Sequence, residues 1–170
     1  MSRTLYHGDN LEAMRRLKSK TVTLAYFDPP FNSNKTYAKG KGEFHDTFVK
    51  PSRSLQAALR KKNLVLADLV SLSVKIHGES MAAYLQYMAL RLLEVKRLLK
   101  DDGSFYYHCD DNASHYVKTM LDCVFGANHY RNDLIWRRAI AHNDAKRFGR
   151  IVDNILYYVC LLYTSPSPRD

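Results

Sequence analysis

The stretch 21-TVTLAYFDPPFNSNKTY-37 joins a run of β-forming side chains to a turn that contains two prolines. Residues 21–27 are rich in Val, Leu, Tyr and Phe without strict polar alternation, which predicts a strand covered on both faces, as in a parallel sheet. Asp28 follows directly at the end of this strand. Ligands of open α/β sheets bind beyond the carboxyl ends of the strands. The stretch therefore predicts a buried strand that delivers Asp28 to a ligand site.

Strand and helix patterns alternate along the rest of the chain. The predicted strands are 3–8, 104–109 and 133–138. The predicted helices are 9–20, 80–103 and 111–126. The first is capped by Asp9 or Asn10, and the second is capped by Ser80 and ends at Gly103. Strands that alternate with helices indicate an α/β sheet.

One domain, residues 1–159, accounts for most of the 170-residue chain, whose hydrophobic content of 46% is enough for a single core. Residues 38–77 lack a clean period and are interpreted as an insertion or lid, with a polar loop at 39–46 and one or two helices within 52–69. The Ser/Pro-rich end, 160–170, is expected to be a non-native or disordered tail.

The charge and cysteine content narrow the class of protein. Twenty-six Lys and Arg against seventeen Asp and Glu give a net charge of +9, which favours an anionic partner over a neutral one, with a merely solvated basic surface as the alternative. The three cysteines form no CxxC pair, which indicates reduced thiols in a cytoplasmic protein and no zinc site. The sequence contains neither a signal peptide nor an apolar run of membrane-spanning length. We expect a soluble cytoplasmic protein without metal.

The turn 28-DPPF-31 has a particular hydrogen-bonding character. Pro29 and Pro30 lack N–H groups, so the turn offers carbonyl oxygens and the Asp28 carboxylate without competing donors. An acceptor-only corner suits a group with two hydrogens, such as the exocyclic amine of a nucleobase, and Phe31 offers a flat face for its ring. The alternative is an Asp-capped turn with a core phenylalanine.

The segment 7-HGDNLEAMRRL-17, followed by 21–37, closely resembles the DNA amino-methyltransferases, the adenine-N6 and cytosine-N4 family with its DPP(Y/F) motif. The resemblance continues in the same order through 79–126, 130–138 and 141–159. It implies a partial Rossmann-like, S-adenosylmethionine-dependent methyltransferase sheet with helices on both faces. It also implies the branch in which the catalytic motif precedes a glycine-rich cofactor motif, as in bacterial restriction-modification systems. The sequence contains no such glycine-rich loop after a strand, so we expect an N-terminal fragment.

The family mechanism implies roles for individual residues. Asp28, Pro29, Pro30 and Phe31 would form the catalytic corner for direct methyl transfer to a flipped base, with adenine N6 favoured over cytosine N4. The cofactor S-adenosylmethionine would lie near Asp9, Asn10 and Asp28, although Asp9 and Asn10 have a helix-cap alternative.

Other polar residues near the motifs receive more ordinary interpretations. Cys109 is interpreted as a core thiol rather than a nucleophile. His108 and Asp110 are interpreted as loop or cap residues rather than the start of a metal site.

A basic cluster is expected to contact the phosphates of double-stranded DNA, with a solvated basic face as the alternative. Its members are Arg131, Arg137, Arg138, Lys146, Arg147 and Arg150. Trp136 is interpreted as a packing residue, with a stacking platform as the alternative. The oligomeric state is left open, a homodimer included.

Two other functions remain possible. One is an inactive DNA-binding fragment of such an enzyme. The other is methylation of another planar amide or amine, as in the related protein-glutamine methyltransferases, but Asp instead of Asn at position 28 disfavours this function.

Overall fold

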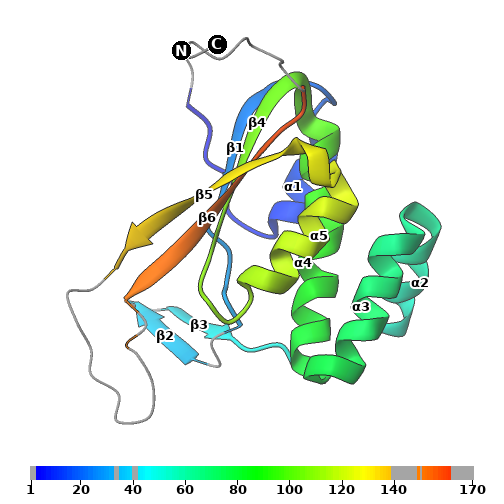
Figure 1. Ribbon diagram of the computed structural model, residues 1–170, viewed down its shortest axis with the longest axis vertical. Coiled ribbons are helices and arrows are strands. Elements are labelled where there is room, and N and C mark those ends of the chain that lie inside the picture. Colours follow the sequence, from blue (N-terminus) through cyan, green and yellow to red (C-terminus); the bar gives the residue numbers. More distant parts are fainter. Residues whose placement is uncertain (1–2, 33–34, 40–41, 139–148, 150, 162–170) are drawn as a thin grey trace, which may run out of the picture.

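The computed structural model describes residues 3–32, 35–39, 42–138, 149 and 151–161. A sheet, a layer of helices on one of its faces and an outer helical pair lie side by side (Figure 1). The elements in chain order are α1 (Asn10–Arg16), β1 (Val22–Phe27), β2 (Lys35–Lys39), β3 (Gly42–Asp46), α2 (Arg53–Lys62), α3 (Leu64–His77), α4 (Glu79–Leu98), β4 (Leu99–Cys109), α5 (Ser114–Phe125), the short 3-10 helix η1 (Ala127–His129), β5 (Tyr130–Arg137) and β6 (Val152–Val159).

The main sheet has the strand order β1-β4-β6-β5. β1 pairs with β4 in parallel, whereas β6 is antiparallel to both β4 and β5. β1, β4 and β5 therefore run in one direction, and their carboxyl ends lie along the same edge of the sheet. The predicted α/β class is confirmed, with a mixed sheet in place of a purely parallel one.

The core lies between this sheet and the helices α4 and α5. Phe105, Tyr107 and Tyr158 are fully buried on the inner face of the sheet. The ring of Phe105 stacks on Phe125 of α5, with 5.3 Å between centroids, and the Tyr107 hydroxyl bonds to the hydroxyl of Tyr84 in α4 over 2.9 Å. Burying each such side chain stabilises the fold by about 1.5–3 kcal/mol, so these contacts fix the sheet against α4 and α5.

The segment predicted as an insertion forms the outer layer. α2 and α3 pack on α4 on the side away from the sheet (Figure 1), burying Leu59, Leu66 and Val70. The predicted polar loop at 39–46 is wrong in part, because Gly42–Asp46 pairs with β2 as an antiparallel hairpin. Hairpin pairing satisfies the backbone of such a segment without an apolar pattern, which is why periodicity missed it.

The described helices cover one face of the sheet, so the expected cover on both faces is not found in this part of the chain. Strand side chains alternate between faces, and Leu24 and Tyr26 of β1 point to the open face, where they are 56% and 51% exposed. The prediction that β1 is buried on both faces is therefore wrong. Trp136 of β5 is 59% exposed, so its predicted packing role is wrong as well.

Several predicted boundaries differ from the structure. Residues 3–8 are not a strand, and Leu5 is almost fully exposed, because no neighbouring strand of the described chain pairs with this segment. The long helix begins after Gly78 rather than at a Ser80 cap, and Ser80 bonds elsewhere. Gly103 lies within β4 instead of ending the helix.

The first helix is shorter than predicted. It ends at Arg16 rather than near residue 20, since Leu17 already has extended backbone angles. Asp9 is its N-cap, as predicted, and accepts a hydrogen bond from the backbone N–H of Leu11 over 2.8 Å. This cap fixes where the N-terminal segment turns into α1.

Candidate functional site

The predicted corner lies at the carboxyl end of β1. The Asp28 side chain is 60% exposed there, and Pro29, Pro30 and Phe31 are half-buried. The two prolines contribute carbonyl oxygens but no N–H groups, so the acceptor character inferred from sequence is retained. The exposed carboxylate is therefore free to meet a ligand from solvent.

Asn32 ends the corner in a conformation that is uncommon for residues other than glycine. Its φ is +58°, in the left-handed region that Asn tolerates better than most residues. The side chain is buried, and its Oδ1 accepts a hydrogen bond from the Ser80 hydroxyl over 3.1 Å. Ser80 lies in the first turn of α4, so this bond ties the corner to the central helix. The role of Asn32 was not predicted from the sequence, although an Asn directly after the DPPF turn is a signal for it.

His108 lies next to Asp28, although β1 and β4 are far apart in the sequence. Phe27 is paired with Tyr107 across the two strands, so the following residues, Asp28 and His108, also meet. His108 Nδ1 is 3.2 Å from Asp28 Oδ1 and 3.2 Å from the Tyr26 hydroxyl. The predicted loop or cap role of His108 is therefore wrong, because the residue lies within β4 and faces the corner.

A buried carboxylate lies on the other side of the His108 ring. Nε2 is 3.3 Å from Oδ2 of Asp153 in β6, whose side chain is only 4% exposed. Arg138 Nη1 lies 3.1 Å from Asp153 Oδ1 as an ion pair, and that oxygen makes no hydrogen bond within the described residues. Arg138 therefore offsets the charge of Asp153, and His108 Nε2 meets its other oxygen.

Phe31 and Tyr26, the aromatic residues of the corner, both lie beside the His108 ring. The Phe31 ring centroid lies 5.3 Å from that of His108, tilted by 59°. Burial, together with the nearby charge of Asp28, raises the pKa of the Tyr26 phenol, so Tyr26 stays a neutral O–H group at physiological pH. The corner thus combines one exposed carboxylate, an imidazole and two aromatic rings.

Asp9 and Asn10 are held by one buried cation. Arg91 of α4 donates from Nη2 to Asp9 Oδ1 over 2.7 Å and from Nε to Asn10 Oδ1 over 2.8 Å. The Arg91 side chain is 4% exposed, and its burial lowers the pKa of the guanidinium, while Asp9 opposes that shift. The helix-cap alternative for Asp9 is confirmed by the bond that it accepts from the Leu11 N–H, and the Arg91 contacts explain why the N-terminus of α1 lies against α4.

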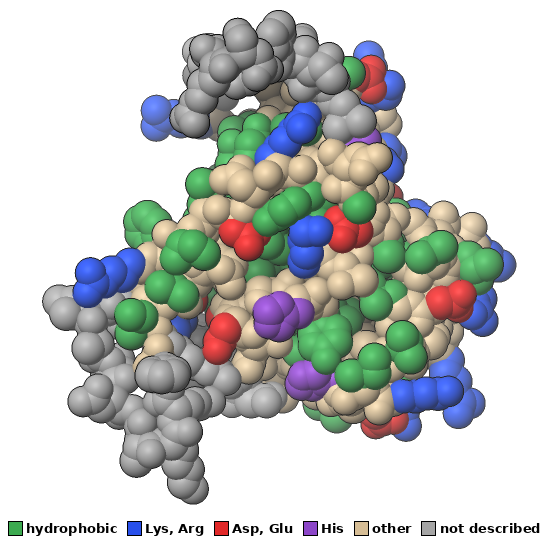
Figure 2. All heavy atoms as spheres, viewed as in Figure 1, with side chains coloured by type: hydrophobic (Ala, Val, Ile, Leu, Met, Phe, Trp, Pro, Cys, Tyr) green, Lys and Arg blue, Asp and Glu red, His purple; other side chains and the backbone are tan. Residues whose placement is uncertain are grey.

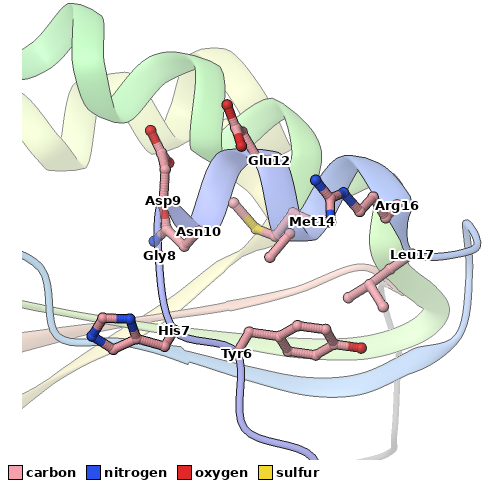
Figure 3. Close-up of a pocket in the computed structure, with 10 residues that line it drawn as sticks. Tyr6, His7, Gly8, Asp9, Asn10, Glu12, Met14, Arg16 and Leu17 are labelled. Carbon is pink, nitrogen blue, oxygen red and sulfur yellow. The ribbon is translucent and has the colours of Figure 1, made fainter.

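A cavity of about 320 Å³ opens beside these residues (Figure 3). Tyr6 and His7 lie on one side of it and α1 on the other, and its described lining runs from Tyr6 to Leu17, Asp9 and Asn10 included. Asp28 is not part of that lining. The three residues predicted to hold a cofactor are therefore divided between the cavity and the corner.

The predicted basic cluster is also divided. Arg137 and Arg138 lie at the carboxyl end of β5, the same edge of the sheet as Asp28, whereas Arg131 lies near the opposite end of the strand. Lys146, Arg147 and Arg150 lie outside the described residues. Figure 2 shows further Lys and Arg side chains around α2 and α3, a basic surface that the sequence analysis did not single out.

Cys109 and Asp110 have structural surroundings. Cys109 is fully buried, and burial raises the pKa of its thiol to about 12, which confirms the core interpretation. Asp110 accepts a hydrogen bond from the backbone N–H of Asn112, as a turn residue does.

The described residues contain no cluster of His, Cys, Asp and Glu suited to a metal ion. Among those same residues, no helix is long and apolar enough to cross a membrane.

Comparison with known proteins gives consistent matches. Residues 22–160 match the family model described as DNA methylase. The Mod subunit of the type III restriction-modification enzyme StyLTI from Salmonella typhimurium is 33% identical over 135 residues, which are 77% of this chain and 20% of that protein. The type II methyltransferase M.EcaI from Enterobacter cloacae is 31% identical over 154 residues, which are 89% of this chain and 28% of that protein. The chain thus spans 20% to 28% of the length of these relatives.

Proposed function

Since this chain belongs to the DNA methylase family, we propose that its Asp28 corner holds the exocyclic amine of a flipped DNA base during methyl transfer. The favoured target is adenine N6, ahead of cytosine N4. The observation that carries the proposal is the exposed Asp28 carboxylate at the carboxyl end of β1, next to two prolines that offer acceptors only. A base must leave the stacked duplex to reach such a corner, as other base-modifying enzymes require.

The corner would activate the amine by accepting its hydrogens. The lone pair of an aromatic amine is delocalised into the ring, so the nitrogen is a poor nucleophile. Hydrogen bonds to the Asp28 carboxylate and the Pro29 carbonyl would localise that lone pair and stabilise the positive charge that develops on nitrogen. Phe31 would stack on the base. S-adenosylmethionine, when bound, supplies a methyl group on a positively charged sulfur.

The cavity beside α1 fits a role in holding that cofactor. Its volume of about 320 Å³ lies at the lower end of the range for small-molecule sites. Asp9 keeps a half-exposed carboxylate at its rim, and Tyr6 contributes an aromatic ring. Asp9 and Asn10 would orient the polar part of the cofactor, and Asp28 would contribute from the neighbouring corner.

DNA would approach the edge of the sheet that carries the corner. Arg137 lies on this edge with an exposed side chain and is our candidate for a phosphate contact. Arg138 also lies there, although its ion pair with Asp153 commits part of its guanidinium. The described cysteines are free thiols, which fits the reducing cytoplasm, where bacterial DNA is found.

A second candidate is DNA binding without methyl transfer. It is favoured by the division between the cavity at residues 6–17 and the corner at Asp28, which do not share a lining residue. In that case the chain would bind DNA through its basic edge, and the corner would carry out no chemistry on its own.

The test is transfer of tritium from labelled S-adenosylmethionine to double-stranded DNA by the chain, with Asp28→Ala and a matched control, Asp68→Ala. Asp68 is an exposed residue of α3 paired with Arg60, so its loss should cost little. We expect label in DNA with the wild-type and Asp68→Ala chains, and a loss of at least about 100-fold with Asp28→Ala. Label that persists in Asp28→Ala would contradict the proposed corner, whereas DNA binding without label would support the second candidate.

A further inference from the structure

His108 lies between an exposed carboxylate and a buried one. Nδ1 faces Asp28 and Nε2 faces Asp153, at 3.2 and 3.3 Å. The His108 side chain is 14% exposed, so few competing water contacts are available to the ring. The three residues form a chain that runs from the interior of the sheet to the corner.

Asp153 determines how the His108 ring is oriented. Its side chain is buried in β6, and a buried carboxylate is costly unless it is paired and hydrogen-bonded. Arg138 lies against Oδ1, which leaves Oδ2 for Nε2 of the imidazole. This contact fixes one side of the ring, so the opposite nitrogen points to Asp28.

The Asp28 carboxylate has two oxygens with different surroundings. Oδ1 lies 3.2 Å from His108 Nδ1, and the Tyr26 hydroxyl lies 3.2 Å from the same nitrogen. The other oxygen, together with the Pro29 carbonyl, would then remain for the two hydrogens of an amine. Without the imidazole, the exposed Asp28 side chain would be free to rotate away from that arrangement.

We propose that His108, oriented by the buried carboxylate of Asp153, is a positioning residue that holds one oxygen of Asp28 and leaves the other for the amine. This inference rests on the proposed function of the corner. His108 does not touch the base in this account, and it acts through Asp28.

Two carboxylates and a phenol surround the His108 ring. The charged and titratable groups that face it from the described elements are Tyr26, Asp28 and Asp153, with Arg138 behind Asp153.

The contact itself is tested by ¹⁵N NMR of the histidine rings in the 170-residue chain. Asp28→Asn removes the charge of an exposed side chain and should leave the fold intact, and Asp68→Asn is the matched control. We expect Asp28→Asn to shift the Nδ1 signal of His108 and Asp153→Asn to shift its Nε2 signal, while the control shifts neither. Ring signals of His108 that do not respond to Asp28→Asn would overturn the inference.

The consequence for catalysis is tested with His108→Gln, which offers one amide nitrogen in place of the two ring nitrogens that face Asp28 and Asp153. We expect kcat to fall about 10- to 100-fold, as for other residues that orient a reacting group, with the Kd for DNA within twofold of wild type. An unchanged kcat, or a loss confined to DNA binding, would overturn the positioning role. Because the NMR test needs no methyl transfer, an inactive wild-type chain would count against the proposed function and leave the inference to be decided by the ring signals.

Discussion

The Ser80 hydroxyl donates a hydrogen bond to Oδ1 of Asn32 across 3.1 Å, although 48 residues separate the two in the chain. This bond joins the end of the DPPF turn to the first turn of α4. It makes the position of the Asp28 corner depend on the central helix, which is itself fixed by the core.

Ser80→Ala should weaken this connection. Loss of one partly buried hydrogen bond is expected to lower the free energy of unfolding by about 1 kcal/mol, measured by urea denaturation. Ser54→Ala is the control: it removes a hydroxyl of α2 whose hydrogen bond to the Ser52 hydroxyl is exposed, so it should change the free energy of unfolding by less than about 0.5 kcal/mol. Equal effects of the two variants would contradict the connection.

The backbone of Asn32 should respond to substitution in a characteristic order. Its φ of +58° is accessible to Gly at no steric cost but strained for a β-branched residue. Asn32→Val should therefore reduce the free energy of unfolding by about 1–2 kcal/mol more than Asn32→Gly, measured by thermal or urea unfolding. If Asn32→Val is as stable as Asn32→Gly, the left-handed conformation is not populated in solution.

Arg91 should be far more important for stability than a surface arginine. Its buried guanidinium binds Asp9 and Asn10. Removing one partner of a buried ion pair typically costs about 3–5 kcal/mol. Because Asp9 is half-exposed, we expect Arg91→Ala to lower the free energy of unfolding by an amount at or below the low end of that range. Arg60→Ala, which breaks an exposed pair with Asp68, should cost less than about 1 kcal/mol. Similar unfolding free energies for the two variants would contradict the role of Arg91 in anchoring α1.

The three thiols should differ in reactivity. Burial raises the pKa of Cys109 to about 12, so almost none of it is thiolate at pH 8. Cys123 and Cys160 are only half-buried. Iodoacetamide at pH 8, followed by mass spectrometry, should modify Cys123 and Cys160 well before Cys109, which should react only as the pH approaches 12 or the chain unfolds. Early modification of Cys109 would show that this end of β4 is open to solvent.

Local patterns in the sequence predicted much of this fold. The β-rich run before Asp28, the Asp9 cap and the apolar spacing of α4 are properties of neighbouring residues, so they could be recognised without knowing the topology. The acceptor character of the DPPF turn follows from the chemistry of proline alone. These predictions held because no distant contact was needed to establish them.

The environment of the corner could not be predicted in the same way. His108 reaches Asp28 and Asp153 only through the register of β1, β4 and β6, with contacts that cross 80 and 45 residues of sequence. The open face of the sheet, where Tyr26 and Trp136 are exposed, depends on which helices pack on which side. Apolar side chains alone do not indicate which face of the sheet the helices cover, so the sequence predicts that β1 is buried on both faces.

The most direct test of the central claim is the identity of the methylated nucleoside. DNA treated with the chain and S-adenosylmethionine is digested to nucleosides and analysed by mass spectrometry, with Asp28→Ala and Asp68→Ala treated in parallel. Our account predicts a methyl group on an exocyclic nitrogen, adenine N6 first, with wild type and Asp68→Ala, and its loss with Asp28→Ala. A methyl group on a ring carbon of cytosine, or a methylated amine that persists with Asp28→Ala, would contradict it.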